Sequence, residues 1–153
     1  MSLHPLAIHR PNGSWPCAVP EMGIADFRFV PLDTPERMAE EALAMDNDLG
    51  ERSDTCRLGA ARYYSIRDAG TDERLAVLEL TRDKRGAWKP TALKGPAERE
   101  VDDLGICLAA SWLAFEYEKR DRRGRERRAL AEVIQLRRSM PAMLVASAVR
   151  SPA

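Results

Sequence analysis

The chain has 153 residues, of which 44% are hydrophobic and 31% are charged, and its 24 basic and 24 acidic side chains cancel. This length allows one domain with a real core, and the apolar content excludes a wholly disordered chain. The zero net charge argues against a non-specific nucleic-acid binder, which is usually clearly basic.

The three cysteines, at positions 17, 56 and 107, have no C-x-x-C spacing and are odd in number. This usage favours a reducing compartment without structural disulfides. The first residues do not form a basic region followed by an apolar run, and no apolar run approaches the roughly 20 residues that span a bilayer. We therefore expect a cytoplasmic protein without a membrane partner.

The chain begins with an arm, residues 1–21, that holds four of the ten prolines and is predicted to be extended or irregular. Alternation at Phe27 and Phe29 indicates a strand. A helix start follows, because Asp33 or Thr34 can accept the free backbone N–H groups and Pro35 fits the first turn.

Three further strands are predicted at 62–67, 75–81 and 88–93. The segment 75–81 is apolar on both faces and is expected to be central. Pro90 cannot donate a ladder hydrogen bond, so its strand belongs at an edge or carries a bulge. The short connections that contain Gly and Asp favour an antiparallel meander.

The strongest helix pattern covers 101–117 and has two apolar stripes, so this helix should be buried by the chain or by a partner. The charged segment 118–128 reads either as a linker or as an exposed helical extension. Helical patterns resume after it, with another helix start at 139–141. The fold class is therefore α+β, a short antiparallel β-meander of three or four strands packed against a buried helix. The predicted divisions are the arm 1–21, the core 22–117 and a C-terminal part 118–153.

Charge is segregated along the chain, with an acidic segment at 36–54 and a basic segment at 119–128. Such a separation suits a protein partner or self-association as a homodimer, although two solvated helix surfaces are the simpler explanation. The candidate partner-binding residues are Glu40, Glu41, Asp46, Asp48, Glu51 and Asp54.

Several short motifs occur in a fixed order within residues 24–117. They are Met45, Asn47-Asp48-Leu49-Gly50, Cys56, Gly59, Arg62-Tyr63-Tyr64-Ser65-Ile66-Arg67, Ala76-Val77-Leu78-Glu79-Leu80 and Leu93-Lys94-Gly95-Pro96. In this order and spacing the chain resembles the PcfJ-like family, which is encoded by conjugative plasmids and phages. The resemblance implies a protein of a mobile genetic element.

One departure from that family pattern concerns its chemistry. The family has a His-Cys pair where this chain has Asn47 and Asp48. His and Cys are residue types that can bind a metal or provide a thiolate, whereas Asn47 cannot titrate and Asp48 cannot act as a thiolate. We therefore expect that this chain does not carry out at Asn47-Asp48 the metal or thiolate chemistry that a His-Cys pair would allow.

Other candidate chemical groups have simpler explanations. His4 and His9, the two histidines, lie in the arm and match no known metal-site spacing. The carboxylates around Asp48 do not have the spacing of an EF-hand loop. Cys56 could be a reactive thiol near arginines, or a packed structural cysteine. Glu79 could pair with Arg62, Arg67 or Lys94. We expect no cofactor, no metal and no catalytic residues.

Nucleic-acid binding is a second hypothesis. Tyr63, Trp88, Lys89 and Lys94 could form an aromatic and basic sheet face, and the arginine-rich segment could contact phosphates. The candidate residues for this role are Arg120, Arg122, Arg123, Arg125, Lys89 and Lys94.

The first functional hypothesis is a non-enzymatic interaction protein of a phage or plasmid that binds a host protein, such as an inhibitor of host defence of the anti-CRISPR kind. The alternatives are a nucleic-acid-binding accessory protein of conjugation or phage replication, and an enzyme that uses Cys56 or the carboxylate cluster.

Overall fold

The computed structural model describes residues 13–140, which form five strands and several helices. The strands are β1 (Met22–Ile24), β2 (Phe27–Pro31), β3 (Ala61–Asp68), β4 (Arg74–Arg82) and β5 (Trp88–Lys94). The helices are α2 (Pro35–Met45), α3 (Ser53–Arg57) and α4 (Leu104–Ser139), with short 3-10 turns η2 (Leu49–Glu51) and η3 (Pro96–Glu98).

All five strands pair as an antiparallel meander in the order β1-β2-β3-β4-β5. The α+β class is confirmed, but the predicted count of three or four strands is wrong. The additional strand, β1, has only three residues and is too short to show alternation in the sequence. As predicted from Pro90, β5 lies at an edge, and its register with β4 shifts between Glu79 and Leu80.

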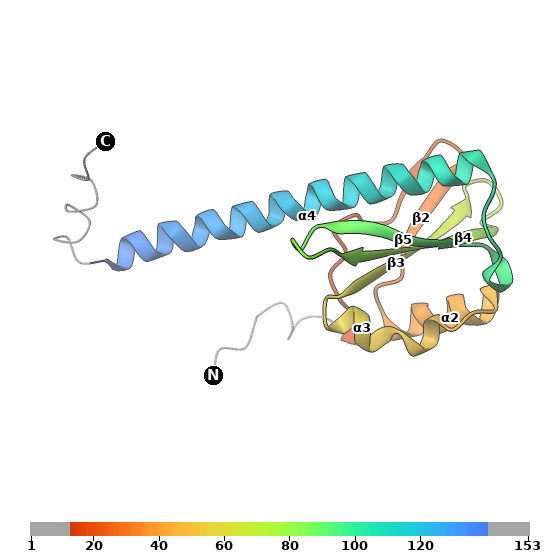
Figure 1. The fold of residues 1–153 in the computed structure, drawn as a ribbon, viewed down its shortest axis with the longest axis horizontal. Helices are drawn as coiled ribbons and strands as arrows, with labels where there is room; N and C mark the ends of the chain where they lie inside the picture. Colours follow the sequence, from red (N-terminus) through yellow and green to blue (C-terminus); the bar gives the residue numbers. More distant parts are fainter. Residues whose placement is uncertain (1–12, 141–153) are drawn as a thin grey trace. The chain divides into compact units, whose positions relative to one another are not determined.

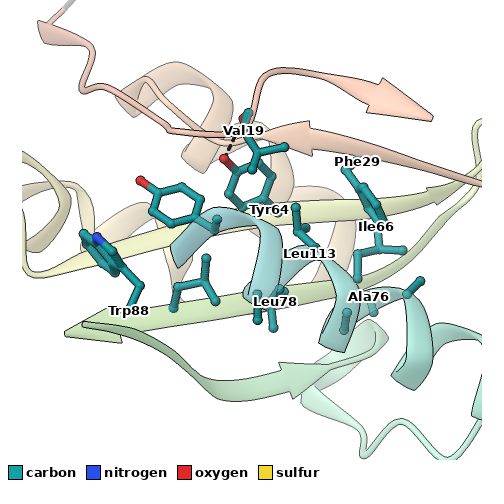
Figure 2. Close-up of a cluster of buried hydrophobic side chains, with 13 residues drawn as sticks. Val19, Phe29, Tyr64, Ile66, Ala76, Leu78, Trp88 and Leu113 are labelled. Atoms are coloured by element: carbon teal, nitrogen blue, oxygen red, sulfur yellow. Dashed lines mark hydrogen bonds between the residues drawn. The ribbon is translucent and has the colours of Figure 1, made fainter. Parts of the chain in front are cut away.

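The first part of α4 covers one face of the sheet (Figure 1). Small residues of the helix, Ala109, Ala110 and Ala114, are buried there and let it approach closely. Tyr64 is fully buried in this layer, and its hydroxyl donates a 2.6 Å hydrogen bond to the carbonyl of Val19, as Figure 2 shows. The Tyr117 ring makes edge-on contacts with Tyr64 and Trp88, at 5.9 and 5.4 Å between ring centroids.

The opposite face of the sheet is covered by the segment between β2 and β3, which contains α2, η2 and α3 (Figure 1). Thr34 caps α2 by accepting a hydrogen bond from the Arg37 N–H at 3.0 Å, as the sequence predicted for this helix start. Met38 and Met45 of α2 are buried against Tyr63 and Val77 of the sheet. β2 and β3 remain neighbours although a helical excursion separates them in sequence.

The described part of the arm, residues 13–21, belongs to both cores. Trp15 is buried in the layer beneath α2 and Val19 in the layer beneath α4. The predicted core, 22–117, is therefore too narrow at its N-terminal side.

The chain divides into two compact units, residues 1–119 and 120–153. Within the described residues, the second unit is the remainder of α4, so the charged segment 118–128 is helical and not a linker. The helix start predicted at 139–141 and the two histidines lie wholly or partly outside the described residues. No helix in the range 13–140 is both long enough and apolar enough to cross a membrane.

The packing of α4 on the sheet predicts a clear contrast between two leucines. Leu113 is fully buried, whereas Leu43 on α2 is 88% exposed. We expect Leu113→Ala to lower the free energy of unfolding by about 2–5 kcal/mol, because it removes contacts and leaves a cavity. Leu43→Ala should change it by less than about 0.5 kcal/mol. Urea titration followed by circular dichroism checks both, and equal midpoints for the two variants would contradict this packing.

Candidate functional site

A polar pocket opens on the face of the sheet that carries α2 and α3. Its cavity volume is about 270 Å³. The lining residues are Asn47, Asp48, Leu49, Arg52, Tyr63, Val77, Glu79, Ala92, Lys94 and Glu98. They come from three neighbouring strands, from the turn after α2 and from η3. The pocket therefore includes the Asn47-Asp48 turn at which the family pattern has His-Cys.

At the back of the pocket, three side chains converge on the carboxylate of Glu79. The Tyr63 hydroxyl donates to Glu79 Oε2 at 2.6 Å, and Arg52 Nη1 donates to the same oxygen at 3.3 Å. The Thr91 hydroxyl donates to Glu79 Oε1 at 2.7 Å. None of the three partners predicted for Glu79 makes these contacts. Arg62 instead donates to backbone carbonyls, and Arg67 pairs with Glu41.

Arg52 connects Glu79 to the turn after α2. Its Nε and Nη2 atoms donate to the two carboxylate oxygens of Asp48 at 3.3 and 3.0 Å. Hydrogen bonding from Arg52 lowers the pKa of Asp48, and the hydrogen bonds to Asp48 and Tyr63 raise the pKa of Arg52. Both groups are therefore charged at neutral pH. The turn itself is set by Asn47 Oδ1, which accepts the Leu49 N–H at 3.0 Å.

The rim of the pocket has a strained backbone. Ala97 and Glu98 adopt left-handed conformations with φ of 56° and 58°. Asp46, immediately before the lining residue Asn47, also has a positive φ, of 53°. A left-handed conformation costs a residue with a side chain roughly 1–2 kcal/mol. Such strain persists only where surrounding contacts impose it, and it is typical of ligand-binding loops.

The protonation state of Tyr63 makes it a hydrogen-bond donor in the pocket. Burial and the hydrogen bond to Glu79 raise the pKa of Tyr63, so its phenol stays neutral and acts as a donor. A phenol with a raised pKa is a poor general base or nucleophile at neutral pH. The arrangement can hold a polar or charged group by hydrogen bonds and charge.

The predicted partner-binding carboxylates do not all lie on the surface. Glu40, Asp46, Asp48, Glu51 and Asp54 are exposed. Glu41 is fully buried, so its assignment to an exposed binding surface is wrong. Its position three residues after Met38 and four before Met45 places it on the buried face of α2. That spacing was visible in the sequence.

Buried Glu41 is compensated by two arginines. Its Oε1 accepts from Arg74 Nε at 2.8 Å and lies 3.5 Å from Arg67 Nη2. Its other oxygen has no hydrogen-bond partner in the described part of the chain. The group therefore fixes α2 to β3 and β4, and it contributes nothing to the pocket.

The predicted nucleic-acid-binding residues do not form one sheet face. Tyr63 and Trp88 are both buried, in layers on opposite faces of the sheet, so neither offers a ring for base stacking. Lys94 lines the pocket and pairs with Glu100, and Lys89 is exposed on β5. Arg120 and Arg125 are half-buried on α4, where Arg125 pairs with Asp121, and Arg122 and Arg123 are exposed.

Other candidate chemical sites receive little support from the geometry. Burial raises the pKa of Cys56 to about 11 and that of Cys17 to about 12, so both thiols are protonated at neutral pH. Among residues 13–140, no three or more His, Cys, Asp or Glu side chains are placed to hold a metal ion together.

The chain was compared with protein-family models, curated proteins and solved structures, and none of the three comparisons gave a match. The resemblance to PcfJ-like proteins therefore remains a prediction from the sequence motifs.

The strained rim predicts an unusual response to glycine. Ala97→Gly should leave the free energy of unfolding unchanged or raise it by up to about 1 kcal/mol, because relief of the left-handed strain outweighs the added freedom of the unfolded chain. Ala39→Gly, on the exposed face of α2, should lower it by about 0.5–1 kcal/mol. Urea unfolding measures both values. A loss at Ala97 as large as that at Ala39 would show that the rim is not strained.

The cysteines give a second prediction. At a pH of about 8, Cys17 and Cys56 should react with iodoacetamide at least roughly tenfold more slowly in the native protein than in urea, because the thiolate is the reactive form. Half-buried Cys107 serves as an internal comparison, and peptide mass spectrometry follows each site. Rapid native labelling of Cys56 would instead support a thiol enzyme.

Proposed function

We propose that this protein is a non-enzymatic binding module and that its pocket receives a basic side chain, Lys or Arg, of a protein partner. The observation that carries the proposal is the acidic pocket between β4 and the Asn47-Asp48 turn, with its strained rim.

Charge determines which group fits the pocket. The lining contains three carboxylates, those of Asp48, Glu79 and Glu98, and two cations, Arg52 and Lys94, so its net charge is −1. Both cations are already paired, Arg52 with Asp48 and Glu79, and Lys94 with Glu100. Glu98 is exposed at the mouth and makes no ion pair in the described range. An incoming cation would therefore find carboxylate oxygens, while an anion would meet net repulsion.

The surroundings of the pocket support the same polarity. Asp46 and Glu51 are exposed beside the turn, and Glu100 follows η3. Apolar Leu49, Val77 and Ala92 line the deeper wall and can pack against the methylene stem of a long basic side chain. A lysine or an arginine meets both requirements, since its stem is apolar and its head is charged.

The wider role follows from the resemblance to PcfJ-like proteins. On that basis we propose that the module belongs to a phage or plasmid and that its partner is a host protein. One such role is that of an inhibitor of host defence of the anti-CRISPR kind. A basic nucleic-acid-binding surface on the host protein is the type of target that an acidic pocket would engage.

Titration with a defined basic peptide tests the pocket. A short arginine-containing peptide should shift the amide resonances of Asp48, Leu49, Val77 and Ala92 in isotope-labelled protein. The same peptide with neutral citrulline in place of arginine should not. Glu98→Lys should weaken binding by about tenfold or more, because it reverses the charge at the mouth.

The matched control is Glu73→Lys in the exposed β3–β4 turn. Glu73 is six positions from Glu79, about 20 Å along an extended strand. This variant should bind as the unaltered protein does. Equal binding of the citrulline peptide, or equal weakening by both variants, would refute a cation-selective pocket.

A further inference from the structure

A stripe of large apolar side chains on α4 faces solvent in the described structure. Leu104, Leu108 and Phe115 are 71%, 61% and 69% exposed. With exposed Ser111 they recur at spacings of four, three and four residues, which places all four within about 60° on the helix surface. The buried stripe of the same helix, with Leu113 and Tyr117, already packs on the sheet. The sequence pattern predicted two apolar stripes. The described chain covers the one with Leu113 and Tyr117; of the other it packs Val101 and Trp112 and leaves Leu104, Leu108 and Phe115 exposed.

An apolar groove lies beside the only small residue of this exposed stripe. It has a cavity volume of about 260 Å³ between α4 and β5. The lining residues are Leu78, Pro90, Ala92, Leu93, Cys107, Ala110 and Ser111. Because Ser111 is short, a side chain from a neighbouring molecule can enter the groove there. The stripe therefore has projecting side chains at Leu108 and a hollow at Ser111, one helical turn apart.

We propose that a second copy of this chain covers the stripe, with the two α4 helices antiparallel about a two-fold axis. The spacing of four, three and four reads the same in both directions. An antiparallel pair therefore sets Leu104 opposite Phe115 of the second copy, and Leu108 opposite Ser111. Each Leu108 then enters the groove of the other copy. The same patch serves both molecules, which is the requirement for a closed two-fold dimer.

Charges at the two ends of the stripe select this orientation. The segment before Leu104 is acidic, with exposed Glu98, Glu100, Asp102 and Asp103. Lys119, one turn after Phe115, is a basic residue at the other end, where it lies 3.3 Å from Glu116 of its own helix. Antiparallel pairing brings Lys119 to the acidic segment of the second copy, whereas parallel pairing brings acidic segments together. The zero net charge of the chain adds no overall repulsion between copies.

Sedimentation velocity of the full chain tests the dimer. From about 1 to about 200 µM, the sedimentation coefficient should rise from the monomer to the dimer value, as expected for a small interface with a roughly micromolar Kd. Leu108→Asp should raise the Kd by at least about tenfold. Leu43→Asp places the same charge at another exposed leucine and should leave the Kd within about twofold. Circular dichroism confirms that both variants are folded.

A charge exchange tests the orientation. Lys119→Glu should weaken the dimer, and adding Asp102→Lys should restore it, because the reversed charges meet again across an antiparallel pair. In a parallel dimer Lys119 would not meet the acidic segment, so Lys119→Glu would not weaken the dimer by loss of that pairing. Adding Asp102→Lys would then not restore association. A monomer throughout the range, or a dimer that is insensitive to Leu108→Asp, overturns the proposal. In either case the stripe would belong to another partner. The variants at Leu108, Lys119 and Asp102 alter no residue that lines the peptide pocket, so these outcomes can be told apart from those of the peptide titration.

Discussion

The central strands β3 and β4 are buried on both faces, so each side of the sheet must be covered by another part of the chain. Every residue from Ala61 to Ile66 is buried, as are Ala76, Val77, Leu78 and Leu80. A half-exposed antiparallel strand would alternate between apolar and polar residues. Here α4 covers one face, while the excursion between β2 and β3 covers the other. The positions of α2, η2 and α3, and hence of the pocket, follow from that requirement.

The pocket is centred on the one charged residue of the β4 face that α2 covers. Glu79 lies on the side of Val77 but is not sealed by α2, and its side chain is 20% exposed. A half-buried carboxylate needs compensating partners. Tyr63, Thr91 and Arg52 supply them, and Arg52 in turn holds Asp48 and the turn after α2. One hydrogen-bonded carboxylate thus couples three strands to the helical layer. By contrast, Glu41 is closed off from solvent and serves only to join α2 to the sheet.

The elements with strong periodicity could be predicted from the sequence, and the site could not. The apolar residues on both faces of 75–81 and the constraint at Pro90 were sufficient to place β4 inside the sheet and β5 at its edge. Periodicity could not show that Arg52 reaches Glu79 across 27 positions, since that contact depends on how the excursion folds back. The left-handed residues Ala97 and Glu98 carry no sequence signal, because alanine and glutamate usually avoid this conformation. Glu41 is the opposite case. Its helical spacing with Met38 and Met45 already indicated burial, but its acidic side chain led to its assignment to an exposed binding surface.

The two faces of α4 differ in a way that folding alone does not require. Its face near the sheet buries three alanines, which gain little from burial, beside Leu113 and Tyr117, and it also packs Ile106 and Trp112, which are partly buried. The large side chains Leu104, Leu108 and Phe115 face outward, where polar residues would serve solubility better. Complete burial of such a side chain is worth about 1.5–3 kcal/mol. Covering three that are still mostly exposed gives several kcal/mol, enough to make a substantial contribution to an association near micromolar Kd. The folded unit thus leaves unused a driving force for association, concentrated on one stripe of its longest helix.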